Sequence, residues 1–309
     1  MLSARGYTHH LRFGGEPVLN PGAGIVRNVS HGWCWLLVAL LSASAGSSLF
    51  AQSPAFPPDH HPWGRFPIGS WKLVRVVTEA IDAQGRVATV TTTETRTTLV
   101  ASDPASYTLR ADVTVEVAGR RFASAPQTLK HGYYGENPGQ PVTVKQLGDS
   151  QLSLDGRMVA CELRQAVVET EGTRRVSTIH YSNSLSPYQL RRETTAEGAA
   201  DDKRATTVVE IVALNLPQRV VDEIKQATYV KTTHQHAQGT KVTLEVQCDD
   251  VPGGVVSHWS SETDAAGKVL RRSTLEMVDY VITEAKAGEI SYGRRQRYHR
   301  RAARRMNDR

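Results

Sequence analysis

Short runs of β-branched residues, each ended by a turn signal, recur along the chain from residue 71 onward. Residues 71–77 (WKLVRVV) lead through residues 82–85 (DAQG) into residues 87–91 (VATVT). Residues 107–117 alternate apolar and polar side chains before a turn at Gly119. Val, Ile and Thr runs bounded by Asp/Gly turns are typical of antiparallel hairpins. The chain is therefore constrained to pair many short strands.

A meander of many strands must close on itself or be covered, because exposed strand edges pair with other chains. We therefore predict an all-β protein, an antiparallel meander of repeated hairpins that forms a curved half-barrel, a barrel or a sandwich. We expect at most one or two short helices. The helix signal is Asn215-Leu216-Pro217, which is predicted to cap and start a short helix with Val220, Val221 and Ile224 on one face.

Two segments of the chain resemble each other at a constant offset of 67 residues. Residues 160–181 (ACELRQAVVETEGTRRVSTIHY) align with residues 227–248 (ATYVKTTHQHAQGTKVTLEVQC). The similarity extends to possible repeats over 160–214 and 227–282, each predicted to hold four antiparallel strands. Residues 71–99 are a looser third copy of the first hairpin. Alternating patterns also align by chance, which is the alternative to duplication.

The N-terminal region has the layout of a secretory signal. Residues 33–41 (WCWLLVALL) are apolar, Arg27 precedes them, and small residues follow. Cleavage is expected after Ala45 or Ala51, and the alternative is an uncut membrane anchor. The apolar run is far shorter than the roughly 20 residues of a spanning helix. We expect residues 1–51 to be a signal peptide with an over-long N-terminus, and the protein to be exported to the periplasm, the envelope or the exterior.

Prolines dominate the next segment, residues 52–67, at positions 54, 57, 58, 62 and 67. Proline fixes its own φ and cannot donate to a sheet ladder, so the segment is predicted to be an extended linker. His60 and His61 are then expected to be solvated. Trp63 is expected to pack over the end of the sheet or to dock on a partner. The all-β domain is predicted to span residues 68–290.

The basic character of the chain is confined to its end. Lys and Arg outnumber Asp and Glu by six over 309 residues, but residues 294–309 alone contribute +7 and residues 52–293 carry −3. Specific nucleic-acid binding is not expected, because such domains usually carry basic charge on the fold itself. Residues 291–309 are predicted to be a disordered tail that either stays solvated or binds an anionic surface. The candidate residues are Arg294, Arg295, Arg297, Arg300, Arg301, Arg304 and Arg305.

Few residues are candidates for a disulfide bond or a metal site. Cys161 and Cys248 could form a disulfide in an oxidising compartment, or be small buried residues within strands. His234 and His236 alternate onto one strand face and are weak candidates for metal ligands, the alternative being a solvated hairpin tip.

No catalytic motif stands out in the sequence. His258, Ser260 and Asp264 lie close together, but there is no Gly-x-Ser-x-Gly elbow. The turn at residues 252–254 (PGG) lacks the Lys and the following helix of a phosphate loop. We expect no cofactor.

Two similar patterns carry a resemblance to a known group. The first is His180-Tyr181-Ser182, Pro187 and residues 190–193 (LRRE), and the second is residues 252–254 (PGG) with residues 270–273 (LRRS). Together with the export signal and the meander, they resemble LolA/LolB-like half-barrels and uncharacterised secreted bacterial relatives. That resemblance implies an apolar concavity that binds acyl chains.

The leading functional prediction is a secreted, non-catalytic binding protein for a lipid-like or apolar ligand. The alternative is an envelope scaffold that binds a protein or an anionic polysaccharide, and a hydrolase is the third possibility.

Overall fold

The computed structural model describes residues 56–137, 139–170, 173–197 and 205–284. The predicted signal peptide and the arginine-rich tail lie outside the described residues. Within them, no helix is long and apolar enough to cross a membrane. The regular elements are one 3-10 turn, η1 (Pro58–His60), and the strands β1 (Trp71–Ile81), β2 (Val87–Ser102), β3 (Ser106–Val117), β4 (Arg120–Ala123), β5 (Gln127–Gly132), β6 (Val142–Leu154), β7 (Arg157–Thr170), β8 (Thr173–Tyr181), β9 (Gln189–Glu197), β10 (Ala205–Val220), β11 (Glu223–His236), β12 (Gly239–Gln247), β13 (Val255–Asp264) and β14 (Val269–Val281).

All strands belong to one antiparallel sheet in the order β4-β3-β2-β1-β14-β13-β12-β11-β10-β9-β8-β7-β6, with β5 beside β4 on the same edge of β3. The first strand, β1, pairs with β2 on one side and with the last strand, β14, on the other. The two ends of the order, β4 and β6, do not pair with each other in the described part of the chain, so the sheet is open.

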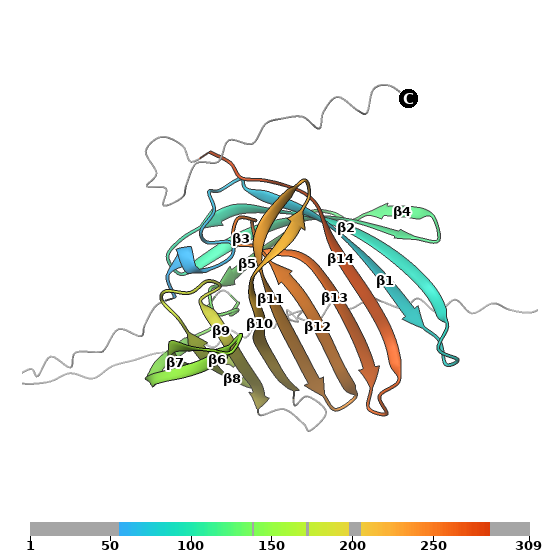
Figure 1. The fold of residues 1–309 in the computed structure, drawn as a ribbon. Helices are drawn as coiled ribbons and strands as arrows, with labels where there is room; N and C mark the ends of the chain where they lie inside the picture. Colours follow the sequence, from blue (N-terminus) through green and yellow to red (C-terminus); the bar gives the residue numbers. More distant parts are fainter. Residues whose placement is uncertain (1–55, 138, 171–172, 198–204, 285–309) are drawn as a thin grey trace, which may run out of the picture. The chain divides into compact units, whose positions relative to one another are not determined.

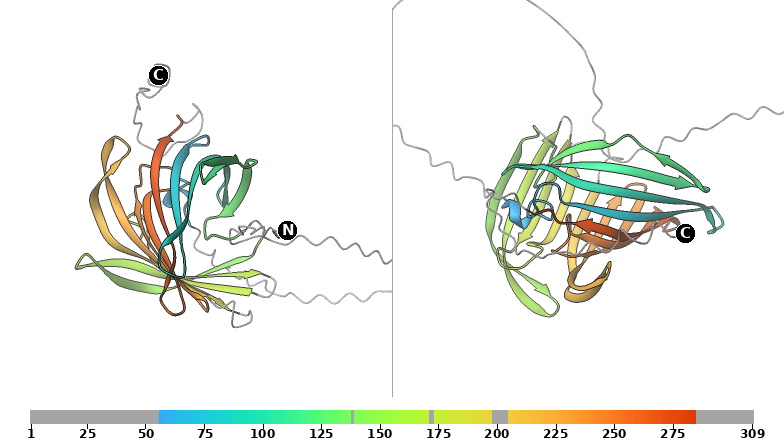
Figure 2. Two further views of the ribbon diagram at one scale, coloured as in Figure 1. Left: turned by 90° about the vertical axis from the view of Figure 1, so that its right-hand side faces the viewer. Right: turned by 90° about the horizontal axis from the view of Figure 1, so that it is seen from above.

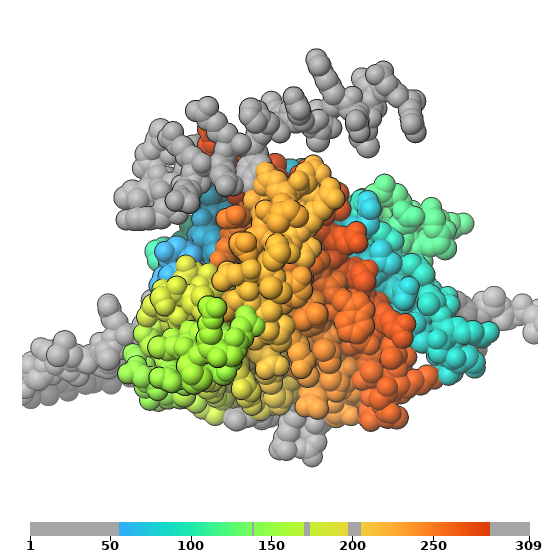
Figure 3. All heavy atoms as spheres, viewed as in Figure 1, coloured from blue at the N-terminus to red at the C-terminus, as the bar shows by residue number. Residues whose placement is uncertain are grey.

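The sheet is strongly bent, and its β1–β3 part and its β6–β9 part turn toward the same side (Figures 1 and 2). In the space-filling view, strands β10–β14 form one continuous surface (Figure 3). The predicted all-β meander is confirmed, and of the three predicted forms the curved, open one is observed.

The two repeat segments have the same order of strands. Residues 160–214 hold β8, β9 and most of β7 and β10, and residues 227–282 hold β12 to β14 and most of β11, in each case as four antiparallel strands. Pro187 lies between β8 and β9, and Pro252 lies between β12 and β13 at the corresponding corner. Duplication itself stays a prediction.

The predicted helix at residue 215 is wrong, because that region belongs to the long β10–β11 hairpin. Leu216 and Pro217 pair with Ala227 and Gln226, after register shifts that begin at Ile211. Asn215 has a φ of 53°, a left-handed conformation that asparagine tolerates better than most residues. Strand pairing therefore overrides the local capping signal.

The proline-rich segment is not the extended, solvated linker that the sequence predicts. Phe56 is 4% exposed and Trp63 is 7% exposed, and η1 lies between them. The expectation that Trp63 packs on the sheet end is met. Prolines shape this segment into a turn that carries its aromatic side chains onto the sheet. Residues 56–70 are called the N-terminal segment below.

Three clusters of buried residues support the sheet. The first joins the N-terminal segment to β6–β8, the second lies around the β12–β13 corner, and the third lies where β6, β7, β9, β10 and β11 come together. Their members are Phe56, Tyr133, Tyr134, Val144, Ala166, Ile179 and Tyr181; Val220, Ala227, Val246, Cys248, Val251 and Val256; and Leu154, Cys161, Leu190, Ile211 and Val230.

Candidate functional site

Side chains alternate between the two faces of each strand, so the register divides the sheet into two surfaces. One surface carries Val74, Leu99 and Val230, which are buried, and Lys72, whose ammonium reaches Trp63 of the N-terminal segment. This surface is called the inner face. The other, the outer face, carries exposed residues such as Trp259, which is 48% exposed. The inner face is the candidate site.

Part of the inner face is an apolar strip, defined as Val74, Val76, Val113, Val115, Leu275 and Met277. Val76 of β1 lies directly opposite Leu275 of β14, and on its other side it faces Thr93, which in turn faces Val115. Apart from Val74, the members of the strip are only partly buried. The strip is therefore a partly accessible surface, mainly apolar, in which Thr93 and Thr95 of β2 lie between the valines of β1 and those of β3.

Next to the strip lies a row of hydroxyl side chains, here called the hydroxyl row. Its residues are directly opposite one another from strand to strand: Thr91, Thr78, Ser273, Ser260, Thr243 and Thr232 on β2, β1, β14, β13, β12 and β11. With about 4.8 Å between strands, the row extends for about 24 Å. Ser260 and Ser273 share a hydrogen bond of 2.7 Å between their oxygens. The predicted apolar concavity is thus apolar only in part.

The residues considered for hydrolysis do not assemble into a triad. His258 lies on the inner face and its Nε2 is 3.5 Å from the oxygen of Ser273. Burial lowers the pKa of His258. Asp264 instead ends β13, where its Oδ1 accepts hydrogen bonds from the backbone N–H groups of Ala266 and Lys268 at 2.9 Å. The carboxylate thus holds a turn rather than orienting the imidazole.

His234 and His236 share one face of β11, as their spacing predicts, with ring centroids 5.5 Å apart. His234 Nδ1 hydrogen-bonds the Thr207 hydroxyl at 2.8 Å, and burial lowers the pKa of His234. His236 lines an open groove of about 790 Å³ at the strand ends. Among the described residues, no group of three or more His, Cys, Asp or Glu side chains lies close enough to hold a metal.

The structure does not bring Cys161 and Cys248 together. Both are buried free thiols, and they belong to different clusters, that of Leu190 and that of Val251. Burial raises the pKa of each thiol, which makes it less reactive. Both are buried, as the alternative prediction expects, but only Cys161 lies within a strand, because Cys248 follows the end of β12.

The N-terminal segment closes one end of the inner face through histidines that the sequence suggested were solvated. The His60 ring stacks on Tyr188, with centroids 3.7 Å apart and planes within 6°, and its Nδ1 hydrogen-bonds the Tyr181 hydroxyl. His61 lies 4.5 Å from the Tyr107 ring centroid, and burial lowers the pKa of His61 to about 4. The expectation that the His60 and His61 side chains are solvated is therefore wrong.

Trp63 is held at the β12–β13 corner. The N–H of Gly253 donates to the carbonyl of Pro62 at 2.9 Å. Gly253 has a φ of 72°, and a Cβ there would lie 2.6 Å from the Trp63 ring, so both the conformation and the close approach require glycine. Lys72 donates to the carbonyl of Val255 at 3.1 Å and lies 5.8 Å from the Trp63 ring centroid. Burial lowers the pKa of Lys72 to about 8.

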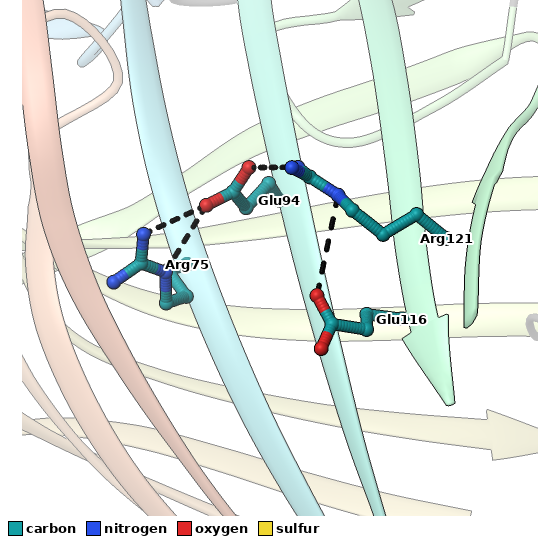
Figure 4. A network of polar contacts seen from close by, with 4 residues as sticks. All are labelled: Arg75, Glu94, Glu116 and Arg121. Atoms are coloured by element: carbon teal, nitrogen blue, oxygen red, sulfur yellow. Dashed lines mark hydrogen bonds and ion pairs between the residues drawn. The ribbon is translucent and has the colours of Figure 1, made fainter. Parts of the chain in front are cut away.

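On the outer face, a polar network ties the short strand β4 to its neighbours (Figure 4). Glu94 of β2 accepts hydrogen bonds from Arg75 at 2.8 Å and from Arg121 at 2.9 Å, and Arg121 also lies 4.0 Å from Glu116. These four residues, with two threonines, line a shallow groove of about 330 Å³. The Arg75 hydrogen bond is the main cause of a lowered pKa for Glu94.

Replacing Arg121 with alanine is expected to lower the free energy of unfolding by less than about 1 kcal/mol, because exposed ion pairs are weak and screened by salt. The Arg121 side chain is 61% exposed. Urea unfolding at low and high salt measures the effect. A loss of several kcal/mol that persists in high salt would contradict a merely surface role.

No family model and no curated protein matches this chain. Among solved structures, it is similar to a "putative lipoprotein" from Parabacteroides distasonis ATCC 8503, with 9% identity over 72% of this chain and 98% of that one, at a TM-score of 0.30. It is also similar to a "putative exported protein with YmcC-like fold" from Bacteroides fragilis NCTC 9343, with 11% identity, coverage of 69% and 97%, and a TM-score of 0.26. At these TM-scores, neither neighbour informs the function of this chain, and the resemblance to LolA/LolB half-barrels stays a prediction.

Proposed function

We propose that this protein is an exported, non-catalytic binding protein that holds an amphipathic, lipid-like ligand on the inner face of its open sheet. The apolar run at residues 33–41 supports export. The observation that carries ligand binding is the apolar strip, an accessible apolar surface on the inner side of a bent sheet. Five of its six residues are partly accessible, and apolar surface that stays accessible in this way is expected to mark a binding site.

The chemistry of the inner face favours an amphipath over a purely apolar ligand. An alkyl chain on the strip gains about 0.8 kcal/mol for each methylene removed from water. The hydroxyl row lies two residues further along the same strands, as Val76 and Thr78 show on β1 and as Leu275 and Ser273 show on β14. A ligand with a polar end can therefore contact both surfaces, whereas an alkane would make no hydrogen bond to the hydroxyl row.

Dodecanoate serves as the first probe, titrated into the exported, purified protein below its micelle concentration and followed by calorimetry and native mass spectrometry. We expect saturable binding that the double variant Val76→Thr/Leu275→Thr weakens about tenfold, because threonine keeps the strand propensity and removes apolar surface. The matched control is Val77→Thr/Leu244→Thr on the outer face. No binding by the wild type of this probe or of an uncharged probe with the same alkyl chain, or equal losses in both variants, would overturn the proposal.

A further inference from the structure

We infer that the head group of this ligand is uncharged and rich in hydroxyl groups, as in a glycolipid; the inference rests on the proposed function and names its ligand class. The hydroxyl row carries it. Six directly paired positions on six neighbouring strands each hold a serine or a threonine. A head group attached to an alkyl chain on the apolar strip would lie across this row, because two residues along a strand cover about 6.6 Å.

Most of these hydroxyls are not used by the fold. Ser260 and Ser273 bond to each other, but Thr78, Thr91, Thr232 and Thr243 make no side-chain hydrogen bond to another described residue. Ser260 and Thr243 are 4% and 8% exposed and form the deepest part of the row, whereas its other members are partly accessible. The hydroxyls of Thr78, Thr91 and Thr232 are both unbonded within the described residues and partly accessible, so they leave donors and acceptors for a ligand.

The row matches a hydroxylated head group in its hydrogen bonding and in its charge. A serine or threonine hydroxyl donates one hydrogen bond and accepts two, as a sugar hydroxyl does, so either partner can take either role. None of the six positions holds the Arg or Lys that recognises a carboxylate or phosphate, or the aromatic ring that recognises a quaternary ammonium. The adjacent charged positions alternate in sign, with Arg271 opposite Glu262 and Glu262 opposite Lys241.

Three probes with the same alkyl chain isolate the head group: dodecyl maltoside, dodecylphosphocholine and dodecanoate, each titrated below its micelle concentration. We expect dodecyl maltoside to bind at least tenfold more tightly than either charged probe. Equal or tighter binding of a charged probe would overturn the head-group inference and leave the proposed function standing. No binding of any of the three would overturn both.

Variants then test whether the row is responsible. Thr78→Val/Thr91→Val keeps the shape of both side chains and is expected to weaken dodecyl maltoside much more than dodecanoate, so that the advantage of dodecyl maltoside is lost. Thr92→Val/Thr274→Val on the outer face is the matched control, and circular dichroism checks folding. Thr232→Val provides a second, single-site variant at the other end of the row. If neither inner variant lowers the preference for dodecyl maltoside, the inference is wrong.

Discussion

Replacing Trp63 with alanine is expected to lower the free energy of unfolding by about 3–5 kcal/mol, the usual cost of truncating a large buried aromatic side chain. The ring is 7% exposed, lies against Gly253 and has the ammonium of Lys72 beside it. The variant removes this packing and leaves the buried ammonium without its aromatic neighbour. Urea unfolding followed by far-ultraviolet circular dichroism measures the loss without depending on tryptophan fluorescence.

Trp259→Ala is the matched control, because Trp259 lies on the outer face and is 48% exposed. It is expected to change stability by no more than about 1 kcal/mol, since substitutions away from buried features usually have small effects. If the two variants lose the same stability, the N-terminal segment does not pack as described and behaves as the extended linker that its prolines suggest.

Lowering the pH from 7 to 4 is expected to destabilise the protein through His61, by up to about 3 kcal/mol. Burial lowers the pKa of His61 from 6.5 to about 4, so between these values the unfolded chain binds a proton that the folded protein does not. The contribution is complete above pH 6.5 and is lost as the pH falls toward 4. The backbone N–H of Trp63 donates to His61 Nδ1 at 3.2 Å, a bond that protonation of that nitrogen would break.

The measurement is the urea midpoint at several pH values for the wild type and for His61→Gln, which keeps an acceptor but does not titrate. We expect a shallower pH dependence between 6.5 and 4 in this variant. His236→Gln, at the tip of the β11–β12 hairpin, is the control and is expected to keep the wild-type slope. Identical slopes for all three proteins would show that His61 is not the titrating group.

The strands of this fold could be predicted from sequence because each one carries a local signal, alternation between two turn residues. The form of the sheet could not, since an open sheet, a barrel and a sandwich have the same alternation and differ only in which edges meet. The pairing of β1 with β14 is one such long-range choice. The helix expected at Asn215 shows the reverse case, in which a local signal was present and a thirteen-position strand pairing overrode it.

The candidate site was less predictable than the fold, for a physical reason. The hydroxyl row takes one residue from each of six strands, and a slip of one residue in any register would move that residue to the other face. Single threonines in a threonine-rich chain carry no signal of such an alignment. In the N-terminal segment only the packing of Trp63 was predicted, because the prolines indicated an extended chain, although Phe56 was apolar enough to suggest burial.

The pairing of β1 with β14 has a consequence for how the chain is made. The first strand to emerge from the ribosome or from an export channel has one neighbour, β2, close behind it, but its other neighbour is the last strand. The N-terminal segment likewise cannot pack in its final position until Gly253, which contacts Pro62 and Trp63, has been synthesised. A nascent chain therefore holds an incomplete sheet with an unpaired edge until synthesis is almost finished. Contacts between residues so distant in sequence make folding slow. Until they form, the unpaired strand edge is exposed and the chain is prone to aggregation.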